Sequence, residues 1–514
     1  MGSLDKSKQL RVGVILSYLQ MALSIIIGII YTPIMIRTLG QSEYGLYNTA
    51  ASVISMLSIL SLGFGSGYLK YYAKYKSRND TDAIYRLNGL FLTIFSVIGA
   101  IALIIGLFLS FNLDLVYDKG LTEHEYSVAK ILMILLTVNL SLSFPFGVFN
   151  TIISANERFI FQKILNMGKT VFAPLLTLPL LFAGKKSIAV VLVTVVLSVA
   201  VDIINAVYVL FKLKDKFYFS NFEKGLFLNM FVYTSFIMIN TIVKQINWNI
   251  DKVLLGRYQG TAVVAVYAVA STLHTYYENF STSVSNVFRT RVHMIVNTTP
   301  KDSSEQREKL TALFTKVGRL QFLILGLVAT GLIFFGEHFI VRYWAGEGYI
   351  ESYYVCLMLV LPASIALIQN VGIDIQRALD RHKFRSIAYL VMSGLNLLLT
   401  VYLCKIYGAV GAAFGTAFSV FVVDGIIMNI YYHKKCNIDI FIFWKNILIA
   451  AKGFIIPTAA GLLLPRILNY SHLYQYLLAI ACYSLIYIVS VWLFSMNQDE
   501  KLMVRKFVTK IKRN

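Results

Sequence analysis

Apolar runs long enough to cross a membrane recur from one end of the chain to the other. A helix of about 20 apolar residues spans the ~30 Å hydrocarbon core of a bilayer. Because lipid offers no hydrogen-bond partners to the backbone, such runs are expected to be helices. We predict an all-α polytopic membrane protein with about fourteen spans, near residues 12–36, 44–69, 87–110, 131–154, 160–183, 187–211, 226–256, 261–288, 320–337, 353–376, 386–404, 408–432, 446–465 and 474–496.

The composition agrees with this class and excludes a soluble protein. Hydrophobic residues make up 57% of the 514 positions and charged residues only 14%, and the mean hydropathy is +0.67. Soluble domains average roughly 25% charged residues. The gaps between spans are too short for a soluble domain, and the first span is too long for the core of a signal peptide. We therefore expect the N-terminus to be retained.

The positive charge is unevenly distributed over the loops. Most of the 47 Lys and Arg residues fall in segments that lie on the same side of the membrane as the N-terminus. Cytoplasmic loops carry such an excess, so both termini are predicted to be cytoplasmic. The net charge of +21 suits an anionic inner leaflet, and no nucleic acid is needed to explain it.

One short sequence occurs twice. The stretch RTLGQSEYGLYNTAAS at 37–52 is matched by RYQGTAVVAVYAVAS at 257–271, so that Gly40 and Tyr47 recur 220 positions later as Gly260 and Tyr267. Six spans, an even number, separate the copies, which indicates a parallel repeat of two six-helix lobes. A glycine at each position permits a tight or left-handed turn. The predicted parts are an N-lobe at 1–222 (spans 1 to 6), a C-lobe at 223–443 (spans 7 to 12), and spans 13 and 14 with a basic cytoplasmic tail at 444–514.

Three stretches resemble a known family. TPIMIRTLGQSEYGLYNTAAS, INWNIDKVLLGRYQG and residues 378–419 are similar to Wzx-type polysaccharide flippases of the multidrug/oligosaccharidyl-lipid/polysaccharide exporter superfamily, and the LG-x-x-EYG-LY element is the most specific. The resemblance implies movement of an undecaprenyl-pyrophosphate-linked oligosaccharide from the inner to the outer leaflet of the bacterial cytoplasmic (inner) membrane by alternating access. It implies a role in capsule, O-antigen or exopolysaccharide biosynthesis.

The same resemblance sets further expectations. Membrane lipids and the polysaccharide polymerase machinery are the expected partners. No enzyme activity and no cofactor are expected. Transport coupled to a proton or sodium gradient is compatible with the resemblance. The first span has no Arg or Lys between Val12 and Ile36. The resemblance to Arg-bearing lipid II flippases is weaker on this point, which counts against a peptidoglycan precursor as the substrate.

Ionisable groups inside the spans are the candidates for substrate binding, because each costs about 2.5–3.5 kcal/mol at the centre of a helix. Lys244, Asn247 and Asp251 are spaced i, i+3, i+7 on one face of span 7. An ammonium suits a pyrophosphate and amide groups suit sugar hydroxyls. Lys252 is a further candidate, as is Lys169, which lies nearer a helix end. The alternative is an interhelical polar network without substrate contact.

A second group of residues is a candidate for binding the coupling ion or proton. His274 and Glu278 are i, i+4 neighbours in span 8, and Asp202 and Asp424 occupy matching places in spans 6 and 12. A carboxyl group in a low dielectric and an imidazole can both exchange protons near neutrality. The alternatives are a hydrogen-bonded pair that holds two helices, and a helix contact repeated by duplication.

Some functions lack their motifs in the sequence. In GKT at 168–170 the first glycine of a phosphate-binding loop is replaced by Lys163, so ATP is not expected to drive transport. The four cysteines lack close spacing and are predicted to be packing thiols without a metal. The longest loop, near 289–319, is basic and predicted to be cytoplasmic. Two competing hypotheses are an ion-coupled multidrug exporter of the same superfamily and, less favoured, a membrane enzyme acting on the same lipid.

Overall fold

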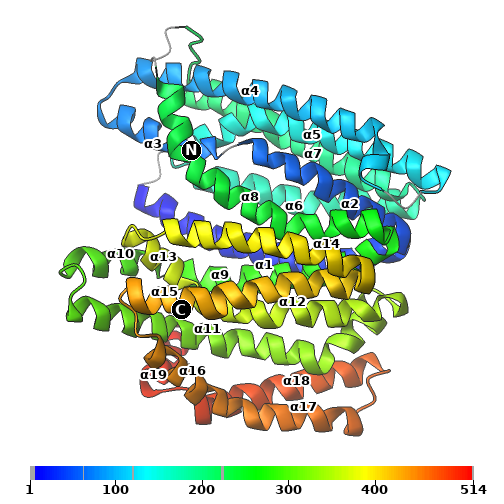
Figure 1. Ribbon diagram of the computed structural model, residues 1–514, viewed down its shortest axis with the longest axis vertical. Coiled ribbons are helices and arrows are strands. Elements are labelled where there is room, and N and C mark those ends of the chain that lie inside the picture. Colours follow the sequence, from blue (N-terminus) through cyan, green and yellow to red (C-terminus); the bar gives the residue numbers. More distant parts are fainter. Residues whose placement is uncertain (1–5, 62, 118–120, 221–224, 287, 512–514) are drawn as a thin grey trace. The chain divides into compact units, whose positions relative to one another are not determined.

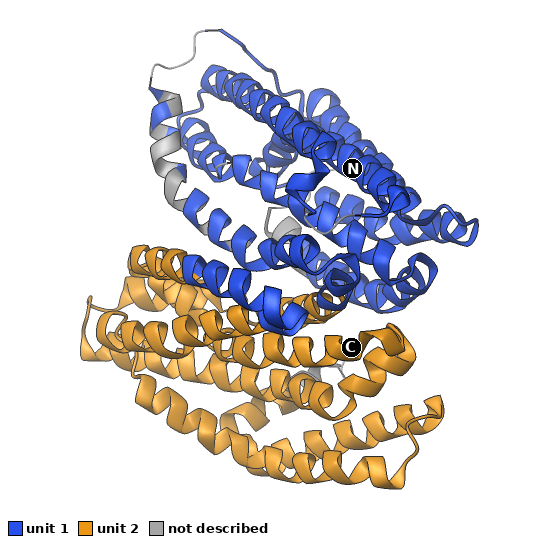
Figure 2. Ribbon diagram, turned by 45° about the vertical axis from the view of Figure 1, so that its right-hand side comes forward, with its two compact units in different colours: residues 1–268, 393–412 blue, residues 269–392, 413–514 orange. Residues whose placement is uncertain are grey.

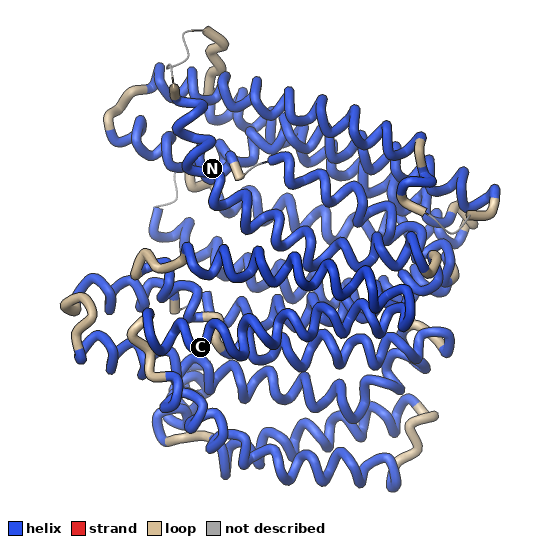
Figure 3. The backbone as a smooth tube through the Cα atoms, viewed as in Figure 1, coloured by secondary structure: helices blue, strands red, loops and turns tan. Residues whose placement is uncertain are grey.

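A computed structural model describes residues 6–61, 63–117, 121–220, 225–286 and 288–511, apart from some side chains within these ranges. Its regular structure is helical, and no strand occurs in the described ranges (Figure 3). The predicted all-α class is confirmed. The chain forms two compact units, residues 1–268 with 393–412 and residues 269–392 with 413–514 (Figure 2).

The helices of the first unit are labelled in chain order in Figure 1. They are α1 (Lys6–Leu39), α2 (Gln41–Met56), α3 (Phe64–Ser77), α4 (Thr81–Phe111), α5 (Glu123–Ala155), α6 (Phe159–Phe182), α7 (Lys186–Val207) and α8 (Leu226–Tyr258). Two long helices, α9 (Thr261–Asn286) and α14 (Lys383–Val420), contribute residues to both units.

The second unit contains the remaining helices. They are α10 (Arg289–Thr298), α11 (Ser304–His338), α12 (Ile350–Ile368), α13 (Val371–Ala378), α15 (Met428–Lys435), α16 (Ile440–Ala451), α17 (Ile455–Ile467), α18 (Leu473–Ser490) and α19 (Gln498–Ile511). The short π-helical turns η6 (Phe421–Ile427) and η8 (Val491–Ser495) continue α14 and α18. The predicted lobe boundaries at 222 and 443 follow the sequence repeat, whereas these units follow packing, so the lobes stay a prediction.

Eleven helical segments of the described residues are long and apolar enough to cross a membrane, so the protein is a multi-pass membrane protein. The count of fourteen is not confirmed. One of the eleven, Lys383–Lys435, has 53 residues and contains Gly408 at φ 57° and ψ −133°, a backbone conformation that glycine adopts most readily. Helices α8 and α9 are not among the eleven. Fourteen spans therefore stay a prediction.

The helices extend beyond the apolar runs. The span predicted at 87–110 is the longer helix α4, whose N-terminus is capped by the Asp80 carboxylate accepting from the Ala83 N–H at 2.9 Å. The segment predicted as a basic cytoplasmic loop at 289–319 is mostly helical, since it forms α10 and the first four turns of α11, and its side of the membrane stays a prediction. Ser303 caps α11 through the Gln306 N–H. Hydropathy marks the hydrocarbon layer, while caps fix where a helix begins.

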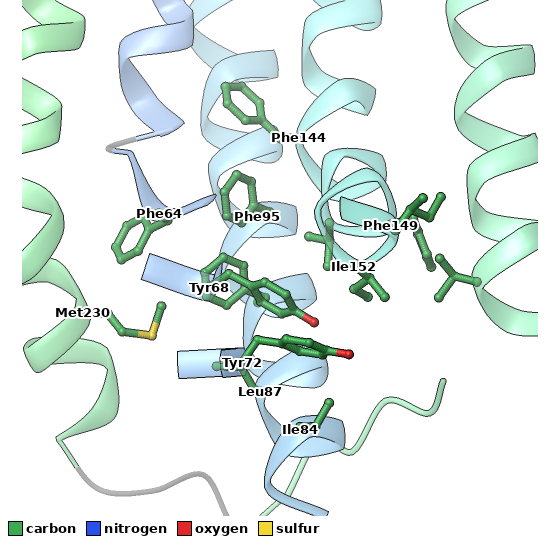
Figure 4. Close-up of a cluster of buried hydrophobic side chains, with 14 of the residues drawn as sticks. Phe64, Tyr68, Tyr72, Ile84, Leu87, Phe95, Phe144, Phe149, Ile152 and Met230 are labelled. Atoms are coloured by element: carbon green, nitrogen blue, oxygen red, sulfur yellow. The ribbon is translucent and has the colours of Figure 1, made fainter. Parts of the chain in front are cut away.

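An aromatic core holds the first unit together where the second predicted span breaks. Residues 57–61 form a 3-10 turn, and α3 starts at Phe64. Phe64 and Tyr68 pack with Phe95 and with Met230 from α8 in one buried cluster (Figure 4). The Tyr68 hydroxyl donates to Asn88 Oδ1 at 2.7 Å, which satisfies the polar end of a fully buried ring. The start of α3, directly after the break, is therefore closely packed.

The repeated sequence forms two hairpins that meet within the first unit. Gly40 and Gly260 turn the chain with φ 78° and 92°, as predicted. At Gly45 of α2 a Cβ atom would lie 1.7 Å from the Thr261 carbonyl oxygen at the start of α9, and Ser42 Oγ lies 2.8 Å from Thr261 Oγ1. Only a glycine at position 45 allows the two helices to approach this closely.

Candidate functional site

The predicted polar stripe of α8 contacts neighbouring helices. Asn247 Oδ1 accepts from Ser393 Oγ at 3.2 Å and from Asn396 Nδ2 at 3.3 Å, and Thr400 Oγ1 donates to Asn396 Oδ1 at 3.2 Å. Three of these side chains, at 393, 396 and 400, are buried in α14. Asn247 therefore belongs to an interhelical polar cluster of the first unit. The Lys244 side chain lies outside the described residues.

Asp251 is fully buried on the same helix. Its Oδ2 accepts from the hydroxyl of Tyr267, a residue of α9 that is 3% exposed. Lys252, the next residue, is half-buried. Gln245 Nε2 donates to Ser58 Oγ at 2.7 Å on a different side of α8. These contacts are those of the alternative interpretation, a polar network between helices, and substrate binding by Asn247, Asp251 or Lys252 stays a prediction.

Lys169 and Asp202 lie close together on α6 and α7. Lys169 Nζ donates to Ser198 Oγ at 2.8 Å, and Asp202 follows Ser198 by one helical turn, so its carboxylate and the ammonium attract each other. Both side chains are half-buried. The sequence assigned Lys169 to the substrate and Asp202 to the coupling ion, and the structure brings the two into one polar site of the first unit.

His274 and Glu278 lie in the part of α9 that belongs to the second unit. His274 is 2% exposed and Glu278 is half-buried. Their neighbours on α9 contact other helices, because the Tyr277 hydroxyl lies 2.7 Å from Ser364 Oγ of α12 and Gln321 Nε2 of α11 donates to Ser281 Oγ at 3.1 Å. This face of α9 is packed within the second unit, and a coupling role stays a prediction.

Asp424 forms part of a buried network in the second unit. The Tyr389 hydroxyl donates to Asp424 Oδ1 at 2.5 Å, and Arg385 Nη2 lies 3.8 Å from the same oxygen. Arg385 Nη1 also donates to the Tyr432 hydroxyl at 3.2 Å, and its guanidinium stacks 4.3 Å from the Tyr389 ring. Asn429 Nδ2 donates to the Asp424 carbonyl at 2.8 Å. These contacts join α14, η6 and α15 within the second unit.

Sequence reasoning missed a buried ion pair in the second unit. Arg319 of α11 and Glu500 of α19 have side chains only 5% and 1% exposed, and two parallel bonds of 2.8 and 3.0 Å join them. Arg319 also donates to the carbonyls of Asn446 and Ser495. The sequence analysis counted Arg319 as a loop cation. The i, i+3, i+4 spacing of Glu500 with Met503 and Val504, on the apolar face of the tail, was the signal that could have revealed the pair.

The same pair lies beside a pocket of about 570 Å³. Helices α11, α16 and α19 line it. On one wall Arg307 Nη2 pairs with Asp439 Oδ2 at 3.2 Å. Burial raises the pKa of Asp439, but the Ile442 N–H and the Arg307 guanidinium outweigh it and lower that pKa. No group of three or more His, Cys, Asp or Glu side chains that could hold a metal occurs in the described ranges.

Comparisons with solved structures identify the fold. The chain is similar to the lipid II flippase MurJ in an inward closed conformation, with a TM-score of 0.67, 16% identity, and coverage of 94% of this chain and 98% of that one. It is similar to an inward-facing multidrug resistance MATE family transporter of the MOP superfamily (TM-score 0.59, 14% identity, 83% and 99% coverage). It is also similar to the Vibrio cholerae MATE transporter VcmN in its bent form, with a TM-score of 0.54, 15% identity, and coverage of 84% of this chain and 97% of that one.

At sequence identities this low, the structural similarity shows the fold alone, which the chain shares with these transporters. A search of curated proteins gave no match. A family model described as "Polysaccharide biosynthesis protein" matches residues 10–287, which is more than half of the chain and includes the repeated hairpins, the Lys169–Asp202 site and the polar residues of α8. The protein therefore belongs to the polysaccharide biosynthesis protein family.

Proposed function

We propose that this protein is a flippase that moves an undecaprenyl-pyrophosphate-linked oligosaccharide from the inner to the outer leaflet of the bacterial cytoplasmic membrane by alternating access. Both termini would be cytoplasmic. The product would serve a surface polysaccharide such as a capsule, an O-antigen or an exopolysaccharide. The family assignment and a fold shared with a lipid II flippase support a lipid-linked substrate. No nucleic acid, ATP or cofactor takes part in this proposal.

The observation that carries the proposal is the Lys169–Asp202 site. Lys169 is the eleventh residue of α6, about 15 Å from the start of that helix at ~1.5 Å per residue. An ammonium that is only half-buried at this depth must contact water or a ligand. It uses one hydrogen bond, to Ser198, out of three donors. The other two donors suit the oxygens of a pyrophosphate.

Asp202 gives this site a way to release its ligand. A nearby carboxylate attracts the ammonium and competes with a bound phosphate, so Lys169 holds the pyrophosphate less tightly than an isolated cation would. A transporter needs such intermediate affinity, because the substrate must leave on the other side. Protonation of Asp202 from a gradient would shift this balance, which is one way in which transport could be coupled to an ion.

The second candidate function is an ion-coupled multidrug exporter. The similarity to MATE transporters and the carboxylate of Asp202 favour it. A multidrug exporter would take up organic cations, for which the acidic group would be the binding partner and Lys169 an obstacle. The two functions thus assign opposite roles to Lys169 and Asp202.

A deletion strain tests the proposal. We expect loss of surface polysaccharide and accumulation of the lipid-linked repeat unit on the cytoplasmic side, both fully reversed by the wild-type gene and only weakly by Lys169→Ala. Lys169→Arg should restore part of the export, since it keeps the positive charge. Normal polysaccharide together with increased sensitivity to cationic drugs would show that the exporter is the correct function.

A further inference from the structure

Helix α19 begins directly at the end of the last membrane-spanning segment. The η8 turn ends at Ser495, and the Met496 N–H still bonds to the Val491 carbonyl at 2.9 Å. Asn497 then caps α19, because its Oδ1 accepts from the Glu500 N–H and Glu500 Oε2 accepts from the Asn497 N–H, both at 2.9 Å. Only two residues separate the two helices, so α19 starts at the surface level of the membrane.

The buried ion pair fixes which face of α19 turns toward the membrane-spanning helices. Glu500 points into the second unit and meets Arg319 of α11. Met503 and Val504 follow Glu500 by three and four residues, which places them on the same face. They are 38% and 37% exposed. The face that Glu500 anchors thus continues as an apolar surface that the described part of the protein leaves uncovered.

Two cations of α19 whose side chains the structure describes lie next to a tryptophan. Lys501 Nζ and the Arg505 guanidinium each lie 5.9 Å from the ring of Trp492 in η8. Tryptophan is enriched at the headgroup level of membranes. An amphipathic helix with basic residues on its polar side and apolar residues on the other lies in the plane of the membrane interface.

We propose that α19 docks on anionic phospholipid headgroups, with Lys501 and Arg505 binding lipid phosphates and Met503 and Val504 entering the boundary of the acyl chains. Charge complementarity favours this occupant, because the chain from 498 to 514 carries six Lys and Arg residues against two acidic ones, and one of those acids, Glu500, is already paired with Arg319. The proposal goes beyond the flippase function and does not depend on which substrate is moved.

The Arg319–Glu500 pair gives this docking a consequence. Arg319 also bonds to the carbonyls of Asn446 in α16 and Ser495 in η8, so it joins three elements of the second unit to α19. Lipid that holds α19 in place thereby holds α11, α16 and η8 together. Loss of the lipid should loosen α19 first, because the remainder of that helix rests on the pair and on Trp492.

Hydrogen exchange of the full-length protein in nanodiscs tests the proposal. We compare the backbone amides of 498–505 in phosphatidylcholine alone and in phosphatidylcholine mixed with phosphatidylglycerol. Each cation near an anionic surface contributes about 1 kcal/mol, so two cations should slow exchange up to about thirtyfold in the mixed lipid. About 1 M NaCl, where the Debye length is ~3 Å, should remove most of the difference.

Matched variants assign the effect to α19. Lys501→Gln with Arg505→Gln should abolish the lipid-dependent protection, while Lys434→Gln with Lys435→Gln, which removes the same charge from exposed positions of the same unit, should keep it. Equal exchange in the two lipids, or protection that persists in the first double variant, overturns the proposal. Protection produced by inorganic phosphate in pure phosphatidylcholine would overturn it too, in favour of a soluble anion as the ligand.

Discussion

Asp202 in α7 and Asp424 in η6 are the same residue in the predicted repeat, but their surroundings differ. Asp202 attracts a half-buried Lys169 that is bonded to a single serine hydroxyl. Asp424 is 6% exposed and contacts Tyr389 and Arg385. In both cases the partner lies on the preceding helix, 33 residues earlier for Lys169 and 35 for Tyr389.

The two pairs differ in whether the charged groups are held by other side chains or can also contact a ligand. In the second unit Arg385 also bonds to the Tyr432 hydroxyl and stacks on Tyr389, so both charges are held in contacts between helices. A buried charge costs free energy unless it is paired and hydrogen-bonded, and Asp424 has both a nearby cation and a hydrogen bond. In the first unit the ammonium keeps donors for other partners. One copy of the duplicated acid thus holds helices together, whereas the other lies beside a half-buried ammonium.

Asp424→Asn should have the largest effect. It removes one charge and leaves the Arg385 guanidinium uncompensated, which costs about 3–5 kcal/mol for a buried pair. We expect a much lower protein level in the membrane and a lower thermal unfolding temperature in detergent. Asp202→Asn is the matched control and should leave both near normal.

A double variant tests whether the loss of stability comes from the uncompensated charge of Arg385. Asp424→Asn combined with Arg385→Met removes both charges, and replacing a buried pair by an apolar side chain is often close to neutral. Recovery of the protein level in the double variant supports a structural pair. A stable Asp424→Asn protein that fails only in export would reverse the comparison and make Asp424 the functional acid.

The sequence predicted the helices better than it predicted their contacts. Apolar runs report the hydrocarbon layer, so the centres of helices such as α4 and α5 were predictable, but their ends depend on caps such as Asp80 and on the Thr122 and Glu125 capping box. Arg385 was counted as a cytoplasmic loop cation, since nothing local to it indicates a carboxylate 39 residues later. The same limit hid the bond between Arg319 and Glu500.

Candidate residues were recognised by type, but their roles were not separable. Asp251 and Asn247 stood out because polar groups are rare in spans, yet only the structure shows that their partners are Tyr267 and the α14 cluster. Lys169 was rated lower than Lys244 because it lies nearer a helix end, where a lysine can reach the interface. It instead bonds across to Ser198, a choice that depends on how α6 and α7 pack.

Lys169→Ala should have the next largest effect, and on export instead of stability. Loss of one charge-assisted contact to a phosphate corresponds to about 1.5 kcal/mol, or roughly tenfold in export rate. The measurement is the rate at which the labelled lipid-linked unit reaches the outer leaflet of proteoliposomes, at matched protein level. Unchanged export would place Lys169 with Asp424 as a structural residue.

A double-mutant cycle measures how strongly Lys169 and Asp202 interact. For a pair that is only half-buried we expect a coupling of about 0.5–1 kcal/mol in unfolding free energy from the Lys169→Ala and Asp202→Ala variants. The corresponding cycle on Arg385 and Asp424 should give a clearly larger value, because solvent screens that pair less. Equal couplings in the two cycles would mean that the two acids do not differ as their surroundings indicate.

Lys309→Ala marks the lower end of the scale. Lys309 Nζ and Glu305 Oε1 are 2.6 Å apart on one face of α11, with side chains 51% and 57% exposed. An exposed i, i+4 pair contributes about 0.3–0.5 kcal/mol at most, since water and salt screen both charges and two long side chains lose rotamer freedom. The unfolding temperature in detergent should hardly change, and export should be normal. A loss of stability as large as that of Asp424→Asn would show that burial is not what separates these pairs, because Lys309 and Glu305 have the shorter contact of the two and differ from Arg385 and Asp424 chiefly in exposure to solvent.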